Sequence, residues 1–381
     1  MINISKLYCG LAGESDYLRY SEANRFGPVI VYNCTARCNL RCLHCYSASQ
    51  YDRADVELTT AEAKRMLAGL AEANCPVVLF SGGEPLLRSD VFELLAEAKR
   101  LGMRTVISTN GTVIDADTAK KLADVGLGYA GISLDGQQEF HDKFRRVAGA
   151  FKAALMAIEN CRNAGIKTGL RFTITKANAD QVPAVFDIAA SEGVRRICYY
   201  HLIRTGRAKA LAGQVPSAEQ TRSVVDTIIE KTDEAVQKDS VDEVLTVGNH
   251  ADGPYLLVRM ERQNSEHYEK AKRLLMTNGG NKTGEKIGCV SWAGDVHPDQ
   301  FWMNYSLGNV KEKSFGQIWH NSAEPVLSKL RNKSQFAESR CLGCRWFELC
   351  RANYRFLGSD PAVESWRNEP ACYLTDDEIS E

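Results

Sequence analysis

Residues 29–45 read Val-Ile-Val-Tyr-Asn-Cys-Thr-Ala-Arg-Cys-Asn-Leu-Arg-Cys-Leu-His-Cys. The first five residues are typical of a buried strand, and the C-x3-C-x2-C array that follows places Cys38, Cys42 and Cys45 on one compact loop. Three thiolates can each hold one iron of a four-iron cubane and leave the fourth iron without a protein ligand. The alternatives are a zinc knuckle that lacks its fourth ligand, or three cysteines that meet by chance. We predict an iron–sulfur cluster at the end of this strand.

The pattern around this loop repeats a strand followed by a helix. Further strands are expected at residues 77–80, 105–109, 129–134, 167–175 and 196–201. Helices are expected at residues 60–73, 90–101, 116–125, 150–164 and 179–191. Repeated units of this kind predict a parallel sheet, since parallel strands need a crossover connection. The expected fold class is therefore α/β, a partial (β/α)6 barrel with a C-terminal iron–sulfur domain and with its chemistry at the carboxyl ends of the strands.

Composition narrows the function classes. The formal net charge of −1 over 381 residues argues against binding nucleic acid through a global positive field. No secretory signal or membrane-spanning apolar run is evident, and clustered cysteines suit a reducing compartment, so a cytoplasmic protein is expected. We divide the chain into an N-terminal extension (1–28), a core (29–216), a helical connection (217–277) and a C-terminal domain (278–381).

A second cysteine group lies in this C-terminal domain. Cys341, Cys344 and Cys350 form a C-x2-C-x5-C array, and Cys372 follows later. Four thiolates complete either a tetrahedral zinc site or a fully ligated cubane, and spacing alone does not separate the two.

The first cysteine array resembles the signature of the radical S-adenosylmethionine superfamily, and the later motifs agree. The resemblance implies S-adenosylmethionine as cofactor, with the GGEP segment (Gly82, Gly83, Glu84, Pro85) binding its amino group. It also implies that Asn110, Ser133 and Asp135 face the ribose and methionine and that Arg171 pairs with the methionine carboxylate. The tail is similar to the auxiliary-cluster (SPASM) tail of that superfamily, although Tyr354 and Asp299 stand where further ligands would be expected. The expectation is two [4Fe–4S] clusters in total and a reducing electron-donor protein as partner.

Segments outside the core resemble one branch of the superfamily, the enzymes that trim side chains of sirohaem-derived tetrapyrroles. These segments are residues 4–8, 249–253, 296–302, 307–310 and 371–375. The resemblance implies an iron tetrapyrrole substrate, didecarboxysirohaem, that loses two acetates to become iron coproporphyrin III. Loss of propionates in d-type haem synthesis is the alternative. A peptide-modifying radical enzyme and a zinc-stapled binding module are further alternatives.

Cations and histidines complete the set of candidate substrate residues. Substrate carboxylates would be met by basic residues of two loops (Lys143, Arg145, Arg146, Arg204, Arg207 and Lys209). His250 and His297 are candidates to ligate the substrate iron or to donate a proton. For each of these residues, an ordinary structural role is the competing interpretation.

Overall fold

The computed structural model describes residues 1–13, 26–52, 56–321, 323–337, 339–353 and 371–380. Within them, one sheet has the strand order β1-β8-β7-β6-β5-β4-β3-β2-β9-β10-β11. The strands are β1 Ile2–Asn3, β2 Val29–Thr35, β3 Val77–Gly82, β4 Arg104–Thr109, β5 Tyr129–Ser133, β6 Thr168–Ile174, β7 Arg196–His201, β8 Glu243–Val247, β9 Ile287–Val290, β10 Asp295–His297 and β11 Gly308–Asn309.

The helices flank this sheet. They are α1 Ile4–Leu7, α3 Thr60–Glu72, α4 Val91–Arg100, α5 Ala116–Asp124, α6 Gln138–Arg145, α7 Ala150–Asn163, α8 Val182–Ser191, α9 Ala218–Gln237, α10 Asp252–Arg262, α11 Tyr268–Asn278, α12 Phe315–Trp319, α13 Pro325–Arg331, α14 Ser339–Leu342, α15 Phe347–Cys350 and α16 Asp376–Ser380. Short 3₁₀ turns are η2 Pro85–Leu87, η3 Ala179–Gln181, η4 Gly206–Gln214 and η5 Lys333–Gln335.

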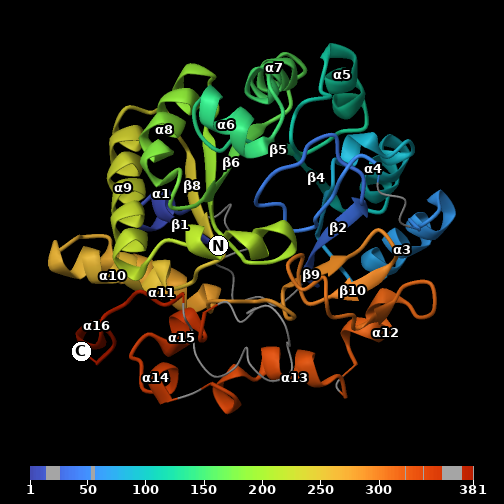
Figure 1. The fold of residues 1–381 in the computed structure, drawn as a ribbon. Helices are drawn as coiled ribbons and strands as arrows, with labels where there is room; N and C mark the ends of the chain where they lie inside the picture. Colours follow the sequence, from blue (N-terminus) through green and yellow to red (C-terminus); the bar gives the residue numbers. More distant parts are fainter. Residues whose placement is uncertain (14–25, 53–55, 322, 338, 354–370, 381) are drawn as a thin grey trace.

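The sheet curls into the expected partial barrel. Strands β2 to β7 each pair in parallel with the next strand along the chain, so that the series ends at β8. Helices α3 to α9 lie around its outside, whereas α12 to α16 lie together below it (Figure 1). The six strands predicted from the sequence correspond to β2 to β7, and the predicted fold class is confirmed.

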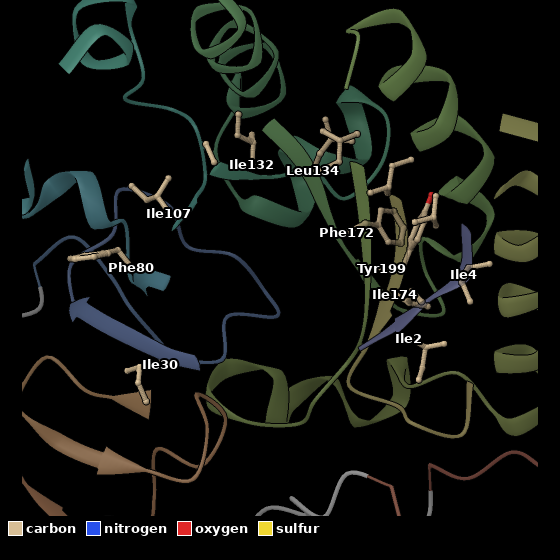
Figure 2. Packing of buried hydrophobic residues seen from close by; sticks show 14 of the residues in the cluster. Ile2, Ile4, Ile30, Phe80, Ile107, Ile132, Leu134, Phe172, Ile174 and Tyr199 are labelled. Carbon is tan, nitrogen blue, oxygen red and sulfur yellow. The ribbon is translucent and has the colours of Figure 1, made fainter. Parts of the chain in front are cut away.

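The main hydrophobic core lies between the strands and the surrounding helices. Alternate strand residues point outward into it, because successive side chains of a strand face opposite sides. Figure 2 shows part of this layer, from Ile30 and Phe80 round to Phe172 and Tyr199, all fully buried. The inward-facing positions carry polar, glycine and some apolar residues, and these form the site.

Strands β1 and β8 and helix α6 are among the elements that were not predicted. Strand β8 extends the parallel series beyond β7, and β1 pairs with it in antiparallel register, Ile2 opposite Thr246. Helix α6 follows β5 and carries Arg145 at its end. The sequence patterns of these elements are short, since β8 is five residues long and α6 is eight residues long.

The C-terminal segment continues the same sheet. Strand β9 pairs in parallel with the other edge of β2, with Val31 opposite Cys289. Strands β10 and β11 then follow in antiparallel order. Among the residues described, no helix combines the length and apolar character that crossing a membrane requires.

Candidate active site at the carboxyl ends of the strands

A cavity opens at the carboxyl ends of strands β2 to β7 and encloses about 1030 Å³, part of it open to solvent. The three thiols Cys38, Cys42 and Cys45 line one side of it. Six other predicted site residues also line it: Gly82, Gly83, Asn110, Ser133, Arg145 and Arg171. The structure therefore brings together residues that lie up to 133 positions apart in the sequence (Cys38 to Arg171).

Hydrogen-bond donors point at the thiols of the cysteine loop. Cys38 Sγ lies 3.4 Å from the backbone nitrogen of Leu40 and 3.8 Å from Asn110 Nδ2, and Cys42 Sγ lies 3.7 Å from Arg145 Nη1. Burial raises the pKa of the Cys38 thiol to about 12, so an uncomplexed thiol there is protonated at neutral pH. Iron requires thiolate ligands, and donors directed at sulfur stabilise them and tune a cluster. This donor set fits the predicted iron–sulfur cluster.

Two of the predicted substrate cations hold the cysteine loop. The guanidinium of Arg207 donates to the carbonyl oxygens of Cys42 (2.8 Å) and Ser49 (2.7 Å). Arg145 is buried and pairs with Asp135 at 2.6 Å. Both guanidinium groups are therefore engaged with the protein, and this geometry favours a structural role over a contact with substrate carboxylates.

The GGEP segment presents backbone to the cavity. Gly82 has a φ of +112°, and a Cβ on Gly83 would lie 2.0 Å from the carbonyl oxygen of Arg37, so only glycine fits this approach. Glu84 is fully buried and accepts from the Asn110 backbone N–H (2.8 Å) and the Thr109 hydroxyl (2.8 Å). Glu84 and Pro85 lie outside the cavity lining. The Glu84 carboxyl links the end of β3 to the end of β4.

Arg171 and Asp135 have different positions relative to the cavity. Arg171 lies on β6, donates to the Tyr200 hydroxyl and stacks on the Tyr200 ring, 5.0 Å from its centroid. Asp135 is buried behind the lining, where its oxygens accept from Arg145 and from the Thr173 backbone N–H (3.0 Å). The Arg145 guanidinium holds the pKa of the Asp135 carboxyl below its usual range, against the opposing effect of burial. Arg171 can therefore contact a ligand in the cavity, whereas Asp135 stabilises the cavity wall from behind.

Comparison with known proteins shows to which family the chain belongs. The Radical SAM superfamily model matches residues 32–189, and an iron–sulfur cluster-binding domain model (SPASM) matches residues 283–345. The chain is 46% identical to Fe-coproporphyrin III synthase of Methanosarcina barkeri over 100% of this chain and 99% of that protein.

The chain belongs to the radical SAM superfamily.

Two further comparisons agree. The chain is 36% identical to pre-heme d1 synthase of Dinoroseobacter shibae over 91% of this chain and 86% of that protein. The solved structure of Streptococcus suis SuiB bound to the precursor peptide SuiA has a TM-score of 0.70 at 19% identity, covering 92% of this chain and 76% of that one. That likeness shows that the two proteins share a fold. This protein is a radical SAM enzyme, with iron–sulfur clusters and S-adenosylmethionine as cofactors.

The auxiliary cysteines lie away from the cavity. Cys341 and Cys344 lie in and after α14, Cys350 ends α15, and Cys372 precedes α16. Burial raises the pKa of the Cys344 thiol, and the nearby thiols of Cys372 and Cys341 raise it further. Donors again reach sulfur: Trp346 N lies 3.4 Å from Cys344 Sγ, and Arg340 Nη1 3.4 Å from Cys372 Sγ.

Among the residues described, no three His, Cys, Asp or Glu side chains are placed to hold one metal ion. In a cubane each thiolate binds a different iron, so its ligands do not converge on one point. Tyr354, one of the two residues that replace expected ligands, lies outside the described residues. Asp299, the other, is buried and accepts from Thr283 Oγ1 at 2.8 Å.

The remaining substrate candidates lie elsewhere. His250 is buried, with Nε2 3.3 Å from the amino-terminal nitrogen, and burial holds its pKa well below the usual value. His297 is buried, with Nδ1 2.6 Å from the carbonyl oxygen of Tyr305. Neither histidine lines the cavity. The other cations are exposed: Lys143, Arg146, Arg204 and Lys209.

Sequence reasoning missed several lining residues. Tyr46, Tyr200 and His201 line the cavity beside the expected set. Tyr46 donates to Asn33 Oδ1 at 2.7 Å, and the histidine at the end of β7 contacts α10. One signal was available: Tyr200 and His201 end a predicted strand, where a barrel places its functional side chains.

Proposed function

We propose that this protein removes the two acetate side chains of didecarboxysirohaem and releases iron coproporphyrin III. The observation that carries the proposal is the 46% identity to Fe-coproporphyrin III synthase across essentially the whole of both chains. Identity of that extent includes the cavity and the C-terminal segment alike. A reducing electron-donor protein completes the proposed system.

The cofactors supply the difficult step. S-adenosylmethionine bound at the first cluster would supply radical chemistry, which can remove hydrogen from an unactivated C–H bond. Cys38, Cys42 and Cys45 would hold that cluster. The glycine backbone at residues 82 and 83 and the guanidinium of Arg171 would hold the methionine end of the cofactor.

The chain supplies orientation and exclusion of water. Apolar side chains, among them Val31, Leu79, Leu202 and Ile203, line the cavity beside the polar ones. An apolar wall limits access of water to a reactive radical and positions a flat macrocycle by contact. Arg204 and Lys209, on the connection after β7, are exposed and are the cations proposed to meet the substrate carboxylates.

Propionate removal is the second candidate. It is favoured by one observation, the 36% identity to pre-heme d1 synthase over most of both chains. Lower identity ranks it below acetate removal.

The test is anaerobic turnover of didecarboxysirohaem with reductant and S-adenosylmethionine, with masses of the products recorded. Loss of both acetates, with all propionates retained, supports the proposal. Loss of propionates with acetates retained moves the protein to d-type haem synthesis. Cofactor cleavage without any change in the tetrapyrrole contradicts both candidates. A variant lacking all three first-cluster cysteines is the negative control.

A further inference from the structure

His201 is a cavity-lining residue with a fixed orientation. It ends β7 and lines the cavity, and its side chain is 13% exposed. Its Nε2 lies 2.9 Å from Asp252 Oδ2. Since a carboxylate oxygen accepts hydrogen bonds, Nε2 is the donor in this contact and Nδ1 is left for another partner.

Asp252 is itself held in place. It is fully buried at the start of α10, and its second oxygen, Oδ1, accepts from the Tyr373 hydroxyl at 2.7 Å. Asn249, three residues earlier, donates to the carbonyl oxygen of Ala371 at 2.8 Å. The segment at residues 249–253 therefore joins the cavity wall to the chain around Cys372.

This arrangement matches that of a metal-binding imidazole. Histidines that bind metal nearly always donate their other ring N–H to a carboxylate or carbonyl, which fixes the tautomer. Within the part of the chain that the structure describes, His201 Nδ1 forms no hydrogen bond. Because His201 lines the cavity, Nδ1 is the ring nitrogen that its side chain has left for a ligand there.

One other histidine lines the cavity, and its surroundings differ. The His44 ring stacks on Phe144 at 4.5 Å with an interplanar angle of 7°, and its Nε2 lies 3.8 Å from Asp135. It stands between Leu43 and Cys45 of the cluster loop. Of the two, His201 is the histidine placed away from that loop, on the wall nearest Leu202 and Ile203.

We propose that His201 binds the iron of the tetrapyrrole substrate through Nδ1, and that Asp252 and Tyr373 are positioning residues for it. The inference rests on the proposed function, because that function supplies an iron tetrapyrrole. It moves the role expected for His250 or His297 to a histidine that the cavity contains.

The experiment uses the anaerobically reconstituted enzyme and ferric iron coproporphyrin III as the probe. With histidine labelled with ¹⁵N and the probe unlabelled, hyperfine spectroscopy of the ferric iron detects a protein imidazole directly. We expect a ¹⁵N coupling in the wild type and in His320→Ala, a matched control at an exposed histidine. The coupling should be lost in His201→Ala, and added imidazole should restore a nitrogen ligand.

Affinity for two probes separates ligation from general damage. His201→Ala and Asp252→Asn should weaken binding of the iron probe by about 10–100-fold. Binding of metal-free coproporphyrin III should be unchanged, which also verifies that each variant is folded.

Three outcomes contradict the inference, and they separate it from the proposed function. A wild type that binds both probes without a ¹⁵N coupling, or a His201→Ala variant that keeps the coupling, overturns the role of His201 and leaves the proposed function standing. A wild type that binds neither probe overturns the proposed function and this inference with it.

Discussion

Arg145 Nη1 lies 3.7 Å from Cys42 Sγ, although the two residues are 103 positions apart in the sequence. The same guanidinium donates through Nε to Asp135 Oδ2 at 2.8 Å. One buried guanidinium thus contacts both the Cys42 thiol of the first cysteine loop and the Asp135 carboxylate that follows β5. Its loss should affect both the stability of the fold and the cluster.

We predict that Arg145→Met destabilises the protein by about 3–5 kcal/mol, because it leaves the buried Asp135 carboxylate without its cation. Iron content after reconstitution should fall as well, since Cys42 loses a donor. Denaturant unfolding and iron analysis measure the two effects. Arg146→Met, at the exposed neighbour, is the control, and equal stability of the two variants would contradict the assignment.

Replacement of Cys38, Cys42 and Cys45 by alanine should abolish reductive cleavage of S-adenosylmethionine. Iron should fall from about eight to about four atoms per chain, because the auxiliary cluster remains. Formation of 5′-deoxyadenosine and iron analysis are the measurements. Alanine at the buried thiols Cys75 and Cys161 is the matched control and should change neither. Cleavage of S-adenosylmethionine by the triple variant would contradict the assignment of the first cluster. Zinc in place of the second cluster would contradict the assignment of the auxiliary cluster.

Gly131→Ala should weaken binding of S-adenosylmethionine by roughly tenfold, the order of one lost hydrogen bond to a charged group. A Cβ at this position would lie 2.7 Å from Arg171 Cδ and would displace that side chain from the cavity wall. Equilibrium binding of the cofactor is the measurement. Gly213→Ala meets no atom within 4 Å and should bind normally. Unchanged binding by Gly131→Ala would argue against contact between Arg171 and the cofactor.

Glu84 should make stability depend on pH. Burial raises the pKa of its carboxyl to about 7 from the usual 4.5, although hydrogen bonds from Asn110 and Thr109 oppose the shift. The folded protein then retains a proton that the unfolded chain loses. The contribution is fully present below pH 4.5 and is lost as pH rises through about 7, by roughly 3 kcal/mol.

The measurement is unfolding by denaturant at several pH values across that window. Glu84→Gln should remove most of the decline in stability, whereas Glu93→Gln, at a half-exposed helix position, should retain it. A parallel decline in all three proteins would assign the pH dependence to other groups.

The barrel was predictable because its signals are local. Strands such as β3 and helices such as α3 have uninterrupted patterns, and α3 begins with a capping box between Thr59 and Glu62. Cysteine spacing and strand-end placement likewise indicated which thiols and glycines would meet. These features depend on residues close together in the sequence.

The roles of charged side chains were less predictable. Arg145 and Arg207 were candidate substrate contacts, and the structure engages both with the cysteine loop. His201 was not singled out, because its significance depends on Asp252, which is 51 residues away. Pairings across such distances are determined by the tertiary fold, and no local pattern reports them.

The parallel pairing of β9 with β2 has a consequence for how the enzyme can be divided. Ile30 to Tyr32 are paired on one side with β3 and on the other with residues 288–290. A fragment ending before β9 would leave an apolar strand with a row of unsatisfied N–H and C=O groups, a template for aggregation. The strand that leads into the first cysteine loop would become the exposed rim of the barrel. Strand β9 therefore covers the edge of β2 that would otherwise be exposed. The barrel and the C-terminal segment should express well only as one chain.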